Sequence, residues 1–136
     1  MSEVGTNTKA RGDALPSSRD VALAAAHAAE QKQAEDIVVL DVSKIIVITD
    51  YFVICTAGTN RQIRTVIDAV EDGARALGVK PVRREGEAEA GWWLLDFVDV
   101  VVHVFATQER DYYQLERLWS DAPRLSLQGD AATSAR

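Results

Sequence analysis

Two apolar segments separated by only two residues constrain the fold of this chain more than any other feature. The segments are Trp92 to Phe97 and Val100 to Ala106, and Val98 and Asp99 lie between them. Both are rich in the β-branched and aromatic residues that favour strands. Two strands joined by two residues predict an antiparallel hairpin, so the chain must contain a β-sheet.

The hairpin register assigns every side chain to one of two faces, because alternate residues of a strand point to opposite sides. One predicted face is wholly apolar, and we expect it to be core: Trp93, Leu95, Phe97, Val100, Val102 and Val104. The other mixes aromatic, aliphatic and ionisable side chains: Trp92, Leu94, Asp96, Val101, His103 and Phe105. Either a helix covers this mixed face and Asp96 pairs with His103, or the face is an interaction surface.

The remaining segments predict alternating helices and strands, which indicates an α/β or α+β fold with a mixed sheet of about five strands flanked by helices. Ser17 and Asp20 predict the capped start of a first helix. Further helices are expected at 63–77, ending at Gly78, and at 109–120, with Thr107 or Gln108 as its cap; strands are expected at 37–40, 44–49, 51–56 and 79–84, and a polar loop at 85–91.

Length and charge limit the class of protein. The 136 residues allow one domain, which we expect at 18–123 between disordered tails at 1–17 and 124–136. The formal charge is −6, and a chain without a surplus of Lys and Arg is poorly suited to grip nucleic acid. We expect no membrane span and no targeting segment, hence a cytoplasmic protein whose acidic domain meets a basic protein partner.

Three groups of residues have the composition of a chemical site, and each has a simpler interpretation. Cys55, His103 and Asp96 are the residue types of a nucleophilic site, but a lone Cys in an apolar strand is usually core. Gly58 to Asn60 could cradle a phosphate, although a helix cap formed by Thr59 and Gln62 explains them more simply.

Glu85, Glu87 and Glu89 could offer carboxylates to Mg²⁺, although a solvated acidic loop is the simpler interpretation. Two-metal nucleotidyl transfer needs converging carboxylates, and the chain has no Asp-x-Asp sequence. One Cys and two His cannot complete a closed metal site of those residues. We therefore expect no metal, no cofactor and no enzymatic activity.

Six segments in order resemble the ribosomal silencing factor (Iojap-like) family over roughly residues 21–122. They are Glu35 to Val42, Thr49 to Ile54, Glu85-Gly86, Trp92 to Asp96, Asp99 to Phe105 and Arg110 to Trp119. The resemblance implies an α/β domain related in topology to nucleotidyltransferases but without their catalytic site. It also implies binding to large-subunit ribosomal protein fourteen, which blocks joining of the small subunit and lowers translation under nutrient limitation.

The resemblance also implies which residues bind the partner. The family signature falls on Glu85, Trp92, Asp96, Asp99, His103, Arg110, Tyr112, Tyr113 and Glu116. Trp92 would be the apolar anchor, the three acids Glu85, Asp96 and Asp99 would accept Lys or Arg, and the two tyrosines would lie at the rim. The family usually has glycine at the position of Val98, and a β-branched residue there argues against the tightest turn.

Two other hypotheses remain from the sequence. One is a nucleotide-binding or nucleotidyltransferase-like enzyme on the related fold. The other is a homodimer that uses the mixed hairpin face as its interface.

Overall fold

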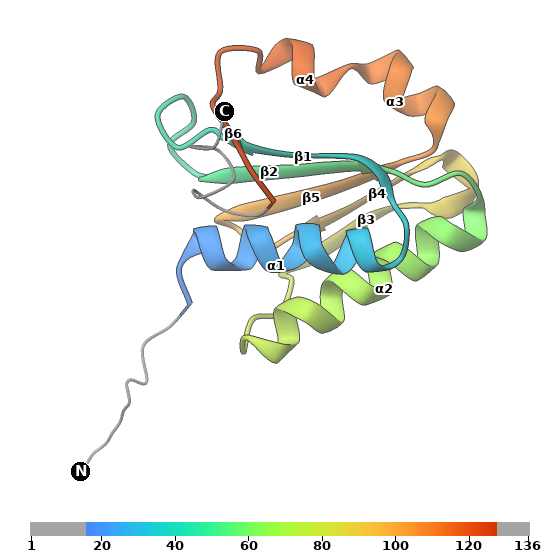
Figure 1. The fold of residues 1–136 in the computed structure, drawn as a ribbon, viewed down its shortest axis with the longest axis horizontal. Helices are drawn as coiled ribbons and strands as arrows, with labels where there is room; N and C mark the ends of the chain where they lie inside the picture. The colour runs from blue at the N-terminus through green and yellow to red at the C-terminus, as the bar shows by residue number, and fades with distance from the viewer. Residues whose placement is uncertain (1–15, 128–136) are drawn as a thin grey trace.

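The computed structural model describes residues 16–127, in which a six-stranded mixed sheet lies between two layers of helices (Figure 1). The strand order is β3–β4–β5–β2–β1–β6. Only the β2–β5 pair is parallel, and the other neighbours are antiparallel. The strands are β1 (Glu35–Asp41), β2 (Tyr51–Thr56), β3 (Arg83–Glu87), β4 (Trp92–Asp96), β5 (Val100–Phe105) and β6 (Arg124–Leu125). The predicted fold class is confirmed, with six strands instead of about five.

The helices α1 (Ser18–Gln31) and α2 (Asn60–Ala76) cover one face of the sheet (Figure 1). The predicted cap of α1 is confirmed, because Ser17 Oγ accepts a hydrogen bond from the Asp20 amide at 3.0 Å. The helix α2 ends as predicted at Gly78, whose φ of 84° only glycine adopts without strain.

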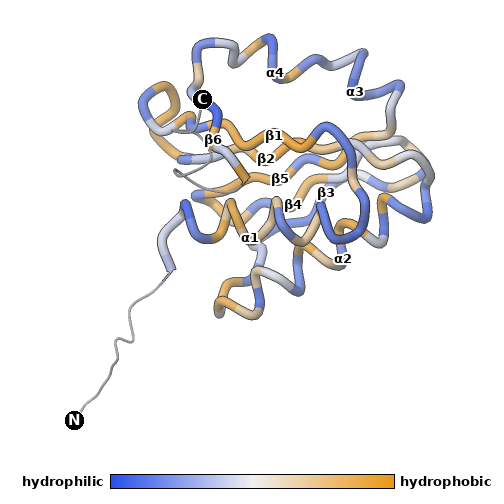
Figure 2. The backbone as a smooth tube through the Cα atoms, viewed as in Figure 1, coloured by the Kyte–Doolittle hydropathy of each residue, from blue (hydrophilic) through white to orange (hydrophobic). Residues whose placement is uncertain are grey.

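The main core lies between these two helices and the sheet. It contains the apolar hairpin face that the sequence predicts, including Leu95, Val102 and Val104, each without exposed surface. The small side chains of α1, among them Ala22 and Ala25, allow that helix to pack closely. Figure 2 shows the central strands β1, β2 and β5 as largely hydrophobic. This face is therefore unavailable to a partner.

The β4–β5 hairpin has the predicted register and the predicted two-residue turn, so the expectation that Val98 opposes a tight turn was wrong. Phe97 pairs with Val100 through an N–H···O hydrogen bond of 2.8 Å. Val98 has a φ of 74°, and the Asp99 amide donates to the Phe97 carbonyl across it at 3.0 Å. This is a γ-turn of the strained, positive-φ kind. Asp96 Oδ1 accepts from the Val98 amide at 2.8 Å and supports the turn.

The strand predicted at 44–49 is a loop. β1 and β2 already pair with each other, so the chain between them must turn back, and the Val42 amide donates to the Asp50 carbonyl at 2.8 Å where the loop closes. Val47 and Ile48 are exposed despite their high β-propensity. Local preference for a strand is ineffective where no neighbouring strand is free to pair.

The strand predicted at 79–84 lies further along the chain, as β3. All five residues of β3 are exposed, because it is the edge strand beside β4. The segment 85–91, predicted as a loop, thus begins within β3 and continues into a 3₁₀ turn, η1 (Ala88–Ala90). A charged edge strand has no apolar alternation by which the sequence could reveal it.

The single helix predicted at 109–120 is two short helices, α3 (Thr107–Tyr113) and α4 (Leu115–Leu118). Gln114, with a φ of 47°, separates them. The predicted cap at Thr107 or Gln108 is also wrong, since Ala106 occupies the N-cap position without a side-chain hydrogen bond. α3 and α4 lie on the opposite side of the sheet from α1 and α2 (Figure 1).

The C-terminal end of the described chain belongs to the sheet. Arg124 and Leu125 form β6 against Leu40 and Val39 of β1, so the tail predicted from residue 124 cannot begin there. Residues 1–15 and 128–136 of the predicted tails lie outside the described residues.

Candidate functional site

The mixed face of the hairpin is only partly covered by α3 and α4. Trp119 contacts Phe52 of β2 edge-on, with ring centroids 5.6 Å apart, and Tyr113 lies 5.7 Å from Phe105 of β5. These helices thus pack over β1, β2 and β5. The half of the face formed by β3, β4 and the neighbouring part of β5 carries the Trp92 and Glu85 side chains.

A buried arginine fixes α3 to the sheet. Arg110 is 7% exposed, and its guanidinium donates to Thr56 Oγ1 at 2.8 Å, to the Asp36 carbonyl at 2.8 Å and to Glu116 Oε2 at 2.6 Å. Burial alone would raise the pKa of Glu116. The hydrogen bonds from Arg110, a backbone hydrogen bond and the positive charges of Arg110 and Arg124 together outweigh it and hold that pKa below its usual range. Arg110 and Glu116, both predicted to bind the partner, thus bind each other and position α3.

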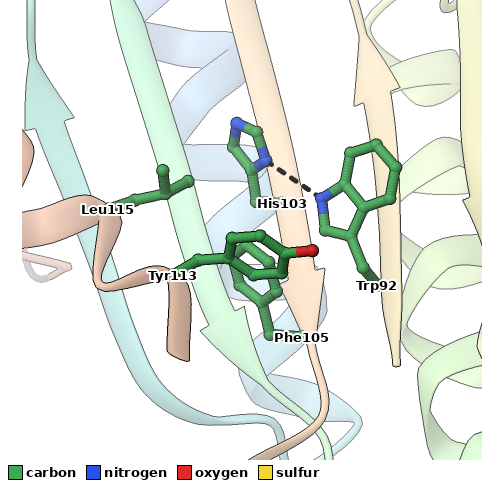
Figure 3. Close-up of a pocket in the computed structure, with 5 residues that line it drawn as sticks. All are labelled: Trp92, His103, Phe105, Tyr113 and Leu115. Carbon is green, nitrogen blue, oxygen red and sulfur yellow. Dashed lines mark hydrogen bonds between the residues drawn. The ribbon is translucent and has the colours of Figure 1, made fainter. Parts of the chain in front are cut away.

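An aromatic pocket lies between α3 and the sheet. Its walls are Trp92 of β4, His103 and Phe105 of β5, Tyr113 of α3 and Leu115 of α4, and its volume is about 250 Å³ (Figure 3). Figure 3 shows the Tyr113 ring in front of Phe105 with its hydroxyl toward Trp92. The pocket gathers three of the nine predicted site residues. The sequence missed Phe105 and Leu115 as site residues, although it placed Phe105 on the mixed face of the hairpin.

His103 forms the back of the pocket in neutral form. Burial lowers its pKa to about 4, and the Trp92 indole N–H donates to His103 Nδ1 over a long 3.5 Å. An imidazole that accepts at Nδ1 carries its proton on Nε2. Asp96 binds Arg83 and not His103, so the Asp96–His103 pairing that the helix-covered interpretation required is wrong.

Acidic side chains lie beside the pocket on the same side of the sheet. Arg83 bridges two of the predicted acceptors, Glu85 at 2.9 Å and Asp96 at 2.7 Å. Glu87 pairs with Trp92 across the two strands. One arginine among three carboxylates leaves this edge negative.

Two of the predicted residues lie away from this group. Asp99 lines a separate cavity of about 190 Å³ with Pro16, Ser18 and Val21 on the α1 side of the sheet. Tyr112 is 80% exposed and contacts Tyr113 edge-on, with the ring centroids 5.1 Å apart. Asp99 is therefore not a neighbour of the pocket, whereas Tyr112 stands just outside it.

The position of Gly86 in the edge strand β3 has room for glycine only. Its φ is 89°, and a Cβ built there would lie 2.4 Å from the Trp92 carbonyl oxygen and 2.8 Å from Trp92 Cε3. Real Cβ atoms do not approach so closely, so any other residue would displace Trp92. Gly86 thereby fixes one wall of the pocket.

The alternative chemical sites do not form. Cys55 lies in the main core, on the other face of the sheet from His103, and burial raises its pKa to about 12. The Gly58 amide donates to Gln62 Oε1 at 2.8 Å and the Gln62 amide to Thr59 Oγ1 at 3.0 Å, so these groups cap α2 instead of facing a phosphate.

The acidic loop residues also diverge. Glu89 pairs with Arg64 of α2, whereas Glu85 pairs with Arg83 on the edge strand. Across residues 16–127, no three Asp, Glu, His or Cys side chains come together as a metal site. Within the same range, no helix has the length and apolarity needed to cross a bilayer.

Comparisons with known proteins show the family of this chain. A family model described as "Ribosomal silencing factor during starvation" matches residues 15–136. The protein of Bacillus subtilis (strain 168) named ribosomal silencing factor RsfS is 45% identical over 103 residues, which cover 76% of this chain and 87% of that protein. The chloroplast protein Iojap of Zea mays is 38% identical over 112 residues, 80% of this chain and 47% of that protein.

A solved structure supports the fold. The crystal structure of a Chromobacterium violaceum protein matches with a TM-score of 0.74 at 33% identity, over 77% of this chain and 88% of that one. With a family model that spans the domain and relatives that share more than a third of its sequence, the chain belongs to the ribosomal silencing factor family.

Proposed function

We propose that this chain represses translation by binding large-subunit ribosomal protein fourteen and thereby blocking the joining of the small and large subunits when nutrients are scarce. The observation that carries the proposal is the uncovered half of the sheet face, where the aromatic pocket lies beside the acidic edge of Glu85, Glu87 and Asp96. Aromatic side chains surrounded by oriented charges are typical of protein interfaces.

The charge distribution supports a basic protein as the partner. Outside residues 16–127, Lys9, Arg11 and Arg136 balance Glu3, Asp13 and Asp130. The described domain thus carries the whole formal charge of −6. Such a domain is attracted to a basic protein and is repelled by exposed phosphates. We place its action in the cytoplasm, where large subunits would meet small ones.

The proposal includes no catalytic step. The aromatic pocket does not suit a nucleotide, because its volume of about 250 Å³ is below the roughly 300 Å³ typical of ligand sites and its lining has no lysine or arginine. A larger cleft of about 460 Å³ is lined by Arg75, Lys80, Arg83 and Arg84, but no group of acids within residues 16–127 could hold the Mg²⁺ that nucleotidyl transfer needs. A thermal shift with nucleotide and Mg²⁺ tests the enzymatic alternative. We expect an unchanged melting temperature, and a rise of several degrees would revive that alternative.

Sedimentation with purified large subunits tests the proposed function. Wild type should cosediment with the large subunit and reduce the yield of joined ribosomes when small subunits are added. Glu85→Lys and Trp92→Ala should each weaken binding by about tenfold or more, which is about 1.4 kcal/mol. The matched control is Asp72→Lys on α2, a change of the same charge at a side chain that is 73% exposed on the other side of the sheet.

If Glu85→Lys and Trp92→Ala both bind as tightly as wild type, the interface does not lie on this face. Failure of wild type to bind any large subunit would refute the function itself. Light scattering with and without ribosomal protein fourteen tests whether a homodimer uses the same face, in which case the two associations compete.

A further inference from the structure

The aromatic pocket differs from a surface on which a partner merely lies, because it is a small concave site with uncharged walls. We infer that it accepts one apolar side chain, aliphatic or aromatic, from the ribosomal protein that the chain binds. This inference rests on the proposed function and names what the site recognises.

The volume of the pocket suits a side chain. About 250 Å³ is below the range of roughly 300 to 1,000 Å³ typical of sites for metabolites and cofactors. The Trp92 N–H is already directed at His103, so the indole presents mainly its ring to the cavity. Phe105 and Leu115 add only hydrocarbon surface.

The lining also selects against a charged group. None of the five lining side chains is an acid, and His103 is neutral near pH 7 because burial lowers its pKa to about 4. A lysine or arginine inserted here would lose hydration without gaining a counter-ion, which is unfavourable. An apolar side chain has no charged group to dehydrate, and it gains contact with four rings.

The geometry reverses the role that the sequence assigned to Trp92. Its ring is partly buried, its N–H is directed at His103, and a Cβ at Gly86 would meet its carbonyl oxygen and Cε3. A side chain packed in this way lines a pocket instead of extending into one on the partner. Trp92 is therefore a wall, and the partner supplies the inserted side chain.

The surroundings identify the occupant as a segment of basic protein. Glu85 and Glu87 lie on β3 on the same side of the sheet as Trp92, where they favour Lys or Arg flanking the inserted residue. A nucleobase of ribosomal RNA could also stack on these rings. Its phosphates would then lie close to the two carboxylates, which opposes RNA as the occupant.

Matched variants separate the pocket from other exposed apolar side chains. Tyr113→Ala removes a wall of the pocket, and Leu115→Trp fills it. The controls are Leu77→Ala, which truncates an exposed side chain at the end of α2 on the other side of the sheet, and Leu118→Trp, which enlarges a side chain that is 71% exposed and outside the lining. We expect the two pocket variants to weaken large-subunit binding by about tenfold or more, and the two controls to stay within about twofold of wild type.

A second measurement reports on the pocket directly in the wild-type protein. In protein labelled with 5-fluorotryptophan, the ¹⁹F resonance of Trp92 should shift when ribosomal protein fourteen binds. That of Trp93, its neighbour on the opposite face of β4, should stay in place. Trp92→Phe and Trp93→Phe assign the two signals.

The outcomes separate the two proposals. If wild type binds large subunits but both pocket variants bind equally well, or the Trp92 resonance does not move, the inference fails and the proposed function stands. If wild type does not bind, the proposed function fails and the inference with it. Loss of binding to protein-free ribosomal RNA in Leu115→Trp, with ribosomal protein fourteen bound as by wild type, would assign the pocket to a nucleobase and overturn the inference.

Discussion

His103 should make the stability of the domain fall steeply in mildly acidic solution. Burial lowers its pKa from the ordinary 6.5 to about 4 in the folded state. Between these values the unfolded chain takes up a proton that the folded chain does not, so the free energy of unfolding decreases as the pH falls. At about 1.4 kcal/mol per pKa unit, the loss reaches about 3 kcal/mol at pH 4 and about 2 kcal/mol at pH 5.

Urea unfolding at about pH 7.5 and about pH 5, followed by tryptophan fluorescence, measures this loss. His103→Gln removes the titrating group and keeps a polar side chain in its place. Carboxylates contribute to the acid sensitivity of both proteins and cancel in the comparison, so wild type should lose about 2 kcal/mol more than the variant. An NMR titration of the His103 imidazole should place its midpoint at about 4.

Equal losses in the two proteins, or an imidazole midpoint near 6.5, would contradict this reasoning. Either result would mean that water solvates His103 and that the pocket is polar. It would also weaken the case for an apolar occupant.

Three further substitutions test how the site is built. Val98→Gly should raise the free energy of unfolding, measured in urea, by about 1 kcal/mol, because glycine adopts the φ of 74° without strain. The side chain of Val98 is 51% exposed, so its removal costs little packing. A decrease would show that the turn is unstrained. Arg110→Ala should lower the free energy of unfolding by about 2 to 3 kcal/mol, because Thr56 and the Asp36 carbonyl lose their hydrogen-bond donor and Glu116 loses its ion pair. Arg110→Lys should restore only part, because an ammonium lacks the planar fork. An unchanged stability would show that Arg110 does not position α3 and would leave it free to bind the partner. Gly86→Ala should weaken both the fold and large-subunit binding by displacing Trp92. Its control is Gly78→Ala, at a φ of 84° with nothing within 4 Å of its Cβ, which should weaken the fold alone. Equal binding by the two variants would show that Gly86 does not shape the pocket.

The parts of the fold that sequence predicts are those set by short-range rules. The hairpin follows from two apolar segments with two residues between them, and the Ser17 cap follows from a hydroxyl placed three residues before Asp20. The loop at 44–49 could not be predicted in this way, since its apolar residues have strand propensity and only the pairing of β1 with β2 forces the turn.

The candidate site, too, could be predicted only where short-range patterns determine it. Alternation along the hairpin placed Trp92, Asp96 and His103 on one face, as the structure has them. It could not show that Arg110 is buried, because Thr56, which receives one of its hydrogen bonds, lies 54 residues earlier in the chain. The pocket is likewise invisible to local patterns, since its walls come from β4, β5, α3 and α4 and depend on how those elements pack.

Site-specific photocrosslinking tests the central claim, that the uncovered half of the sheet face binds the large subunit. A photoreactive phenylalanine at Leu94, which lies on that face between Glu85 and His103, is compared with the same group at Asp72 on the opposite side of the molecule. We expect crosslinks to ribosomal protein fourteen from position 94 and none from position 72. Crosslinks from position 72 alone would place the interface on the side of α1 and α2 and would show that the uncovered half of the sheet face does not bind the large subunit.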